Sequence, residues 1–241
     1  MRIALLADIH GNLPALEAVL ADIAGTGGAD TILVLGDIAM LGPQPAEVIA
    51  RLQQAGCVVI QGNTDTWYRE VIASDYVPGD DRSAGMVNHY RWAQACLSQG
   101  QIRYLLALPF SWQADLGGGE SLLGVHGSPR RFDEAIRPEV TGDALDEMLA
   151  GVTATVVAFG HTHRAMVRRH GRITLVNPGT VGNPIPPDLD PRATYAVVSW
   201  QNGRLEVALR LVDYDPTPTL AAAVERGMPG AAAYGPKFRR K

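Results

Sequence analysis

The chain has 241 residues, of which 46% are hydrophobic and 19% are charged, and its formal net charge is −4 at pH 7. Its length and composition fit one globular domain with a sizeable core. The negative balance excludes the basic surface on which stable nucleic-acid binding depends. The basic end of the sequence, residues 237–241, is expected to be a frayed, solvated tail.

Cysteine usage and the early apolar run bear on the compartment. Cys57 and Cys96 are too few and too isolated for a disulfide framework, and both are expected to be small buried hydrophobic residues. Asp8 and His10 interrupt the early apolar run, which excludes a signal peptide there. No stretch is apolar for long enough to span a membrane. We therefore expect a cytoplasmic protein with no membrane partner.

The first third of the chain alternates short apolar runs with amphipathic patterns. The pattern predicts strands over 3–7, 31–35 and 57–60, separated by helices over 13–24 and 45–55. Glycines at positions 25 and 56 end the two helices. This βαβαβ order implies parallel strands joined by right-handed crossovers.

The middle of the chain is helical from residue 66 to residue 108, with apolar stripes over 86–97 and 102–106. We interpret about 66–109 as a helical cap insert. Strands follow over 110–116 and 121–125, with three glycines between them as a hairpin turn. A short helix over 144–149 precedes a strand over 155–159.

Two further hairpins are predicted in the last third. Strands over 165–170 and 172–176 turn at Gly171, and strands over 195–200 and 204–212 turn at Asn202-Gly203. We expect residues 1–241 to form a single α/β domain, a four-layer αββα sandwich with two stacked sheets. The carboxyl ends of the strands would then meet at one rim.

Seven side chains of metal-ligand type follow the predicted strands. They are Asp8, His10, Asp37, Asn63, His126, His161 and His163. Any one alone is more commonly a hydrogen-bonded loop residue, but the whole set, in this order at five strand ends, is hard to attribute to chance. Carboxylate, imidazole and amide ligands suit Mn, Fe, Zn, Co or Ni. Seven ligands suffice for two ions if one carboxylate bridges them.

The order D-x-H, G-D, G-N, H-G, G-H-x-H resembles that of the calcineurin-like metallophosphoesterase superfamily. Residues 8–17 and 176–182, with the later Asp190-Pro-Arg-Ala193 and Tyr195, are similar to its small bacterial phosphodiesterase-type members. The resemblance covers the chain to about Asp215. It implies a hydrolase of small phosphate esters with two divalent ions, manganese being favoured for activity.

The resemblance also implies a division of ligands. Asp8, His10 and His163 would hold one ion, and Asn63, His126 and His161 the other. Asp37 would bridge the two, and a hydroxide between the ions would be the nucleophile. In this scheme Asp37, Asn63 and His126 take part in catalysis, and Asn63 also touches the phosphate.

One departure from the family pattern concerns the leaving group. Many members have a general-acid histidine after the G-N pair, where this sequence has Thr64. A threonine hydroxyl cannot deliver a proton as imidazolium does, so we expect weak activity on poor leaving groups and better activity on phosphodiesters or activated esters. His89 could supply the acid, or it could be a histidine on the surface of a helix.

Several other residues have two readings. Arg130 and Arg131 either bind a second negative group or belong to a solvated loop. The substrate-binding candidates are Asn63, Thr64, Arg130 and His89. Asp65 is expected to orient a ligand imidazole. Asn12 and Asn177 are expected to support the site or to satisfy turn backbone, and Trp67 and Trp92 either line the site or anchor the insert.

The leading hypothesis is a dimetal phosphodiesterase, with a nucleotide among the candidate substrates. The alternatives are a dinucleoside polyphosphate hydrolase, a phosphomonoesterase and a metal-poor scaffold, such as the retromer subunit of the same fold family. A complete ligand set argues against the scaffold. A homo-oligomer remains open.

Overall fold

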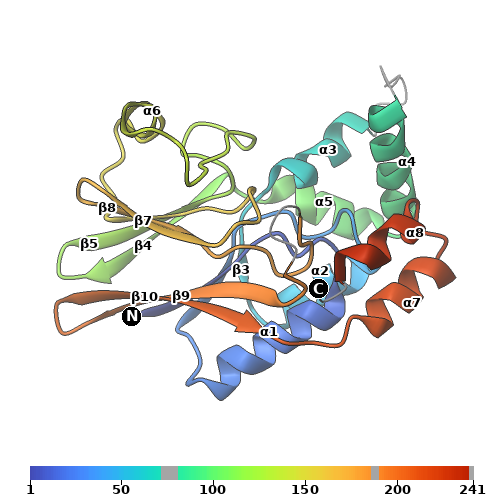
Figure 1. The fold of residues 1–241 in the computed structure, drawn as a ribbon, viewed down its shortest axis with the longest axis horizontal. Helices are drawn as coiled ribbons and strands as arrows, with labels where there is room; N and C mark the ends of the chain where they lie inside the picture. The colour runs from blue at the N-terminus through green and yellow to red at the C-terminus, as the bar shows by residue number, and fades with distance from the viewer. Residues whose placement is uncertain (72–80, 186–189, 239–241) are drawn as a thin grey trace.

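The computed structural model describes residues 1–71, 81–185 and 190–238. Two five-stranded sheets stack face to face, with strand orders β10-β9-β1-β2-β3 and β4-β5-β6-β8-β7. Figure 1 shows α1 beneath the first of these sheets and α6 above the second. This arrangement confirms the predicted four-layer αββα sandwich.

The first sheet contains the predicted βαβαβ unit. Its strands are β1 (Arg2–Leu6), β2 (Thr31–Val34), β3 (Val58–Val59), β9 (Ala193–Gln201) and β10 (Arg204–Val212). Strands β1, β2 and β3 are parallel, while β9 pairs antiparallel with both β1 and β10. Helices α1 (Leu13–Gly25) and α2 (Pro45–Gln54) follow β1 and β2. The predicted parallel pairing of the first three strands and the hairpin around Asn202-Gly203 are thus confirmed.

The second sheet is also mixed. Its strands are β4 (Ser111–Gly117), β5 (Glu120–Val125), β6 (Val156–Ala158), β7 (Met166–His170) and β8 (Ile173–Asn177). The β4–β5 and β7–β8 pairs are antiparallel hairpins, as predicted, whereas β5, β6 and β8 run parallel. Helix α6 (Gly142–Met148) precedes β6.

The two faces of β1 explain why its sequence is continuously apolar. Ile3 and Leu5 belong to the apolar cluster between the sheets, whereas Ala4 and Leu6 join the cluster under α1 and α2. Successive side chains of a strand point to opposite faces, so a central strand buried on both faces needs apolar residues at every position. This packing fixes the carboxyl end of β1, where Asp8 and His10 follow.

Within residues 63–71 and 81–109, the predicted insert contains the helices α3 (Asn63–Val71), α4 (Asp81–Ala95) and α5 (Gln99–Ala107). Tyr68 and Tyr90 are buried in the cluster that also contains the apolar side of α1 and α2. Trp67 packs against the same cluster and stacks on Tyr90, with 4.9 Å between ring centroids. These contacts favour the alternative in which Trp67 anchors the insert.

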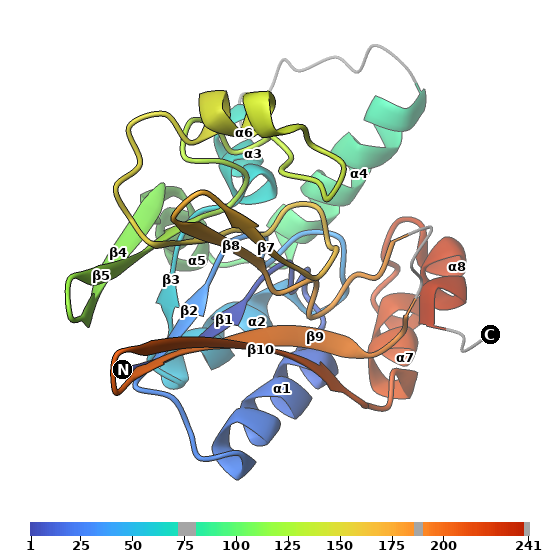
Figure 2. The ribbon, with the colours of Figure 1, turned by 60° about the vertical axis from the view of Figure 1, so that its left-hand side comes forward.

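The C-terminal segment differs from expectation. Helices α7 (Thr217–Glu225) and α8 (Ala231–Tyr234) and the 3-10 helix η1 (Gly235–Phe238) follow β10, and α7 lies beside α1 in Figures 1 and 2. Phe238 is buried, and Lys237 donates a hydrogen bond to Asn183. The expected solvated tail is therefore wrong for residues 237 and 238, because aromatic packing holds them.

Two smaller findings concern the exposure of the two cysteines and the length and apolar character of the helices. Cys57 and Cys96 are half-buried, so the expectation of two buried cysteines was wrong. Among the helices of the described ranges, none combines the length and the apolar character needed to cross a membrane.

Candidate metal centre

The seven predicted ligands come together at the carboxyl ends of the strands. Asp8 and His10 follow β1, and Asp37 follows β2. Asn63 is the first residue of α3, just after β3, and His126 follows β5 directly. His161 and His163 lie in the loop after β6. Both sheets therefore contribute to one site.

Three of these side chains form a first ligand group, namely Asp8, His10 and His163. Asp8 Oδ1 lies 3.2 Å from His163 Nε2 and 3.8 Å from His10 Nε2. The two Nε2 atoms are 3.3 Å apart. All three ligand atoms thus face one point, and each side chain is buried or nearly so.

A second ligand group consists of Asn63, His126 and His161. Asn63 Oδ1 lies 2.9 Å from His126 Nε2 and 2.9 Å from His161 Nδ1. Asp37 lies between the two groups, with Oδ1 at 3.5 Å from His126 Nε2 and Oδ2 at 3.7 Å from His10 Nε2. One carboxylate therefore faces both groups.

Main-chain carbonyl groups set the orientation of three imidazoles. The Nδ1 atoms of His10, His126 and His163 each lie within hydrogen-bond distance of a carbonyl oxygen. These oxygens belong to Met40 at 2.8 Å, Leu35 at 2.6 Å and Asn183 at 2.6 Å, respectively. A carbonyl only accepts, so each Nδ1 donates and each Nε2 presents a lone pair in the neutral ring. Such partners fix the tautomer of metal-binding histidines.

The first ligand group fits a cation. Asp8 Oδ1 is buried and accepts no hydrogen bond within the described residues. With His10 and His163 in the tautomers above, two nitrogen lone pairs and this oxygen converge without a proton between them. A cation would relieve their mutual repulsion, and a mixed carboxylate and imidazole set suits divalent transition ions.

The backbone is strained where the ligands lie. Positive φ angles occur at Asp8 (55°), His10 (48°), Asp37 (56°), His161 (64°) and His163 (57°). Such angles are uncommon for non-glycine residues and cost about 1–3 kcal/mol each. Close packing of the loops adds a second constraint, because a Cβ atom at Gly62 would lie 2.2 Å from Asp37 Oδ1. Strain of this kind gathers at functional sites.

Burial and mutual charge shift the acidity of the cluster. Burial lowers the pKa of His10 to about 3, with the charge of His163 acting in the same direction. Burial raises the pKa of Asp37 to about 7, and the charge of Asp8 adds to this. Burial opposes ionisation of Asp8, but the neighbouring His163 and the other imidazoles lower its pKa to about 2 overall. Among the proposed ligand carboxylates, Asp37 is thus the one whose ionisation depends more on added positive charge.

Comparison with known proteins identifies the family. Residues 1–203 match the model of the calcineurin-like phosphoesterase superfamily domain. The chain belongs to this family. The resemblance seen in the motifs is therefore confirmed, and the protein is a phosphoesterase, a hydrolase of a family that uses divalent metals.

Three relatives are similar over much of the phosphoesterase. A metallophosphoesterase from Sphaerobacter thermophilus is 27% identical, with a TM-score of 0.76 over 99% of each chain. The uncharacterized protein MJ0912 of Methanocaldococcus jannaschii is 25% identical over 94% of this chain and 93% of its own length. Phosphodiesterase YfcE of Escherichia coli is 25% identical over 76% of this chain and 81% of its own.

Asp65 supports the phosphoesterase site in a different way from the one expected. Its carboxylate accepts hydrogen bonds from the backbone N–H groups of Asp37 at 2.8 Å, Ile38 at 3.3 Å and Gly62 at 2.9 Å. The expectation that it orients an imidazole was wrong. It instead ties the loop that carries Asp37 to the loop that carries Asn63.

Asn12 and Asn177 tie loops together, as one of their two readings predicted. Asn12 caps α1 through the N–H of Ala15 and donates to the carbonyl of Gly182. Asn177 donates to the carbonyl of Gly160 at 2.8 Å, next to His161. Each asparagine thereby holds a loop that carries a predicted ligand or that packs against one.

The substrate-binding candidates occupy different places. The N–H of Thr64 donates to Asp37 Oδ1 at 2.9 Å, so Thr64 borders the cluster, and its own hydroxyl is buried without a partner in the described part of the chain. Arg130 and Arg131 lie in the loop after His126, where they pair with Glu134 and Asp133.

His89 is neither on the surface nor free to donate a proton. Its side chain is buried, and Nε2 accepts from the N–H of Leu41 at 3.1 Å. Its Nδ1 faces the carbonyl of Pro229 at 3.3 Å and donates to it. Both ring nitrogens are engaged within the protein, so the surface position was wrong and no ring nitrogen is left for a leaving group.

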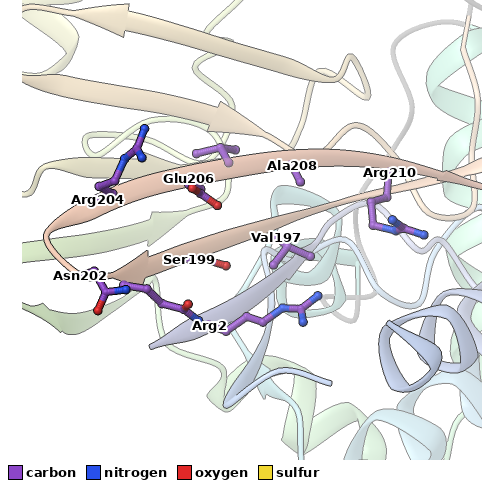
Figure 3. Close-up of a pocket in the computed structure, with 10 residues that line it drawn as sticks. Arg2, Val197, Ser199, Asn202, Arg204, Glu206, Ala208 and Arg210 are labelled. Carbon is purple, nitrogen blue, oxygen red and sulfur yellow. The ribbon is translucent and has the colours of Figure 1, made fainter. Parts of the chain in front are cut away.

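Two cavities differ in their relation to the cluster. One of about 270 Å³ is lined by His163 and Thr180, with Arg164 and Arg192 at its sides. Another of about 740 Å³ lies across β9 and β10, where Figure 3 shows Arg2, Ser199 and Glu206. The second contains none of the predicted ligands, so only the first adjoins the metal centre.

Several supporting residues were missing from the sequence analysis. They are Thr180, Asn183 and Lys237. The hydroxyl of Thr180 donates to the carbonyl of Asp8 at 2.8 Å, the carbonyl of Asn183 accepts from His163, and Lys237 donates to the side chain of Asn183. The motif over 176–182 pointed to this region but ended one residue before Asn183. No local pattern places Lys237 beside it, because that contact depends on how the last helices pack.

Proposed function

We propose that this phosphoesterase hydrolyses phosphodiesters at a centre of two divalent transition-metal ions. The candidate ions are Mn, Fe, Zn, Co and Ni, with Mn favoured for activity. One observation carries the proposal, namely that the two oxygens of Asp37 face separate ligand groups. A single carboxylate shared between two groups of ligands is what a bridged pair of ions requires.

The residues that would hold the ions follow from the distances. Asp8, His10 and His163 would hold one ion, and Asn63, His126 and His161 the other. Asp37 would contact both. When bound, the ions lower the pKa of a coordinated water and neutralise the charge that develops on phosphate.

The protein contributes a rigid frame for this chemistry. Hydrogen bonds from Nδ1 of His10 and His163 to main-chain oxygens keep Nε2 directed at the first ion. Asn63 and His126 would hold the second ion, and Asn63 is also proposed to contact the phosphate as it reacts. Asp65 holds the backbone of Asp37, so the bridging carboxylate keeps its position as substrate binds.

The charges around the centre favour a singly charged diester over a more anionic substrate. Arg164 and Arg192, beside the adjoining cavity, pair with Glu139 and Asp190. Arg130 and Arg131 are also paired. Because carboxylates accompany these guanidinium groups, the surroundings add little net positive charge for a polyphosphate chain or a dianionic monoester.

Thr64 supports the same choice. It borders Asp37 and lacks a group that can protonate a leaving oxygen at neutral pH. Activated esters with good leaving groups suffer least from a missing acid. Thr64 therefore favours activated diesters over unactivated monoesters, and dinucleoside polyphosphates, whose leaving phosphate needs no acid, and phosphomonoesters are the second candidates.

The proposal is tested by a substrate screen with purified full-length protein loaded with Mn²⁺. The panel contains a nitrophenyl diester, nucleotide diesters, dinucleoside polyphosphates and the matching monoesters. We expect the highest kcat/KM on a diester and no turnover after chelation. Faster turnover of the polyphosphates would overturn the diester assignment, and a protein that binds no transition metal would be a scaffold.

A further inference from the structure

The C-terminal segment, residues 216–238, lies outside the part of the chain that matches the family model, which ends at residue 203. It nevertheless reaches the proposed metal centre. Lys237, one of two lysines in the sequence, extends from η1 and is half-buried. A buried ammonium is costly unless it has a specific partner.

The partner of Lys237 is Asn183. Lys237 Nζ donates to Asn183 Oδ1 at 2.8 Å, and Asn183 is only 3% exposed. The main-chain oxygen of the same residue accepts from His163 Nδ1 at 2.6 Å. The contacts thus run from Lys237 through a single residue to a proposed metal ligand.

Asn183 is also linked to a second ligand of the first group. Its N–H donates to Thr180 Oγ1 at 3.0 Å, and the same hydroxyl donates to the main-chain oxygen of Asp8 at 2.8 Å. A shift of Asn183 would therefore disturb the supports of both His163 and Asp8. Its side-chain oxygen is held from the other direction by Lys237.

The segment that presents Lys237 is itself firmly attached. Arg226 donates to the carbonyl of Pro43 at 3.1 Å and pairs with Glu47 at 2.6 Å. The carbonyl of Arg226 accepts from Trp92 Nε1 at 3.0 Å. These bonds lie away from Asn183, so the segment has anchors that do not depend on the lysine.

The position of the ammonium near the centre has an electrostatic consequence. Lys237 reaches the first ligand group through Asn183, which also accepts from His163. After larger effects led by burial, the charge of Lys237 adds to the lowering of the pKa of His10 and of His89. An ammonium has three donors, and the bond to Asn183 uses one of them.

We infer that Lys237 is a positioning residue of the metal centre, which holds Asn183 so that the main-chain oxygen of Asn183 keeps His163 Nε2 directed at the first ion. This role rests on the proposed function. Removing the lysine leaves the buried Oδ1 atom of Asn183 without its donor, and the loop can then move to hydrate it. Loss of partners that orient metal ligands typically lowers metal affinity by roughly 10- to 100-fold.

The test uses full-length protein stripped of metal and titrated with Mn²⁺ by calorimetry. Lys237→Met keeps the length of the side chain and removes its donors, and Lys237→Arg restores a donor. Arg226→Met is the matched control, because it removes a cation from the same segment without touching Asn183. Thermal unfolding of each metal-free variant measures any general loss of stability.

We expect Lys237→Met to weaken one Mn²⁺ site by roughly 10- to 100-fold. At saturating Mn²⁺ its kcat should be lower, with little change in KM. Its midpoint of thermal unfolding should be no lower than that of the Arg226→Met control. Lys237→Arg should recover part of the affinity. In a double-mutant cycle, Asn183→Ala should add little to Lys237→Met, because both break one link.

Unchanged Mn²⁺ affinity in Lys237→Met would overturn the inference, as would a loss matched by Arg226→Met. A rise in KM alone would do so too, since it would make Lys237 a substrate contact. A different result would contradict the proposed function, namely that the unmodified protein itself binds no Mn²⁺.

Discussion

Oδ1 of Asp8 lies 3.2 Å from Nε2 of His163, and both atoms are hydrogen-bond acceptors when the His163 ring is neutral and donates through Nδ1 to Asn183. Burial opposes protonation of this ring, but Asp8 raises the pKa of His163 overall, so the same point attracts a proton when no metal is bound. Two acceptors at this distance repel each other in a buried environment. The protein thus maintains an arrangement that favours a cation. Folding of the surrounding loops holds the two acceptors together against their repulsion, and binding of an ion relieves part of that repulsion.

Metal binding is therefore expected to stabilise the fold. A ligand that binds only the native state adds about 2.7 kcal/mol at a concentration of 100 times its Kd. We expect Mn²⁺ to raise the midpoint of thermal unfolding and EDTA to reverse the change. Because burial and the charge of Asp8 raise the pKa of Asp37 to about 7, Mn²⁺ binding near neutral pH should also release protons. An identical midpoint with Mn²⁺ and with EDTA would contradict this prediction.

Asp37→Asn tests the bridge. The variant keeps the shape of the side chain but removes the charge that faces both ligand groups, so two ions would repel each other with less compensation. We expect activity to disappear and metal content to fall further than in any other single ligand variant, as measured by elemental analysis. Asp143→Asn, on the exposed start of α6, is the control and should change neither. Two retained metals with near-normal turnover would exclude the bridging role.

The sequence predicted the sheets well, and it predicted which side chains gather at the candidate metal centre, because both follow from local patterns. The apolar run of β1 reflects burial on both faces, and the proposed ligands lie in the loops just after strands end. The support of the ligands was harder to predict. Asp65 binds backbone N–H groups of two loops, and that contact depends on how the loops meet in three dimensions.

The C-terminal segment shows a second limit. Alanines and prolines in residues 216–238 give a weak periodic pattern, and the terminal charges suggested a solvated tail. The burial of Phe238 and the bond of Lys237 arise from packing against distant elements. The misplacement of His89 has the same origin, since its partners Leu41 and Pro229 are remote in sequence.

Thr64 is expected to make turnover depend steeply on the pKa of the leaving group. Thr64→His should raise activity on poorly activated esters, with an upper limit of about 10²–10⁴-fold set by general-acid catalysis. The gain will be smaller if the buried site misorients the ring. Rates on a series of substituted phenyl diesters measure the dependence. Thr64→Val is the matched control, because it keeps the shape of the side chain and supplies no acid, so its dependence on the leaving-group pKa should be as steep as that of the unmodified protein.

A flat dependence in the unmodified protein would contradict this account of Thr64. It would mean that the leaving oxygen is protonated by solvent. His89 is not an alternative source, because both of its ring nitrogens have partners within the protein.

His89 is expected to make the stability depend on pH. Burial lowers its pKa below the usual value, and the charge of Lys237 acts in the same direction. The unfolded chain therefore takes up a proton as the pH falls below about 6.5, while the native protein resists protonation. The contribution of His89 is present above that pH and is lost as the pH falls towards its lowered native pKa.

His89→Gln separates this contribution from that of the ligand histidines, which both proteins share. The amide can accept from Leu41 and donate to Pro229 without titrating. Urea unfolding of both proteins between pH 7 and pH 5 should show a smaller loss of stability in the variant. Parallel loss in the two proteins would indicate that His89 does not titrate in this range.

Trp67 is expected to act through packing and not through substrate contact. Its ring stacks on Tyr90 at a centroid distance of 4.9 Å and lies against the apolar cluster under the first sheet. Trp67→Ala should lower the free energy of unfolding by about 2–4 kcal/mol, since the site is partly buried and large aromatic truncations in cores cost somewhat more. Trp67→Phe, which keeps an aromatic face for Tyr90, should lose less than half of that.

The same packing role predicts how Trp67→Ala affects activity. The metal ligands are untouched, so any fall in kcat/KM should be by the same factor for a nucleotide diester and for a small generic diester, measured at a temperature where the variant is folded. A loss confined to the nucleotide substrate, with normal stability, would instead place the Trp67 ring against a base, where stacking contributes about 1–3 kcal/mol.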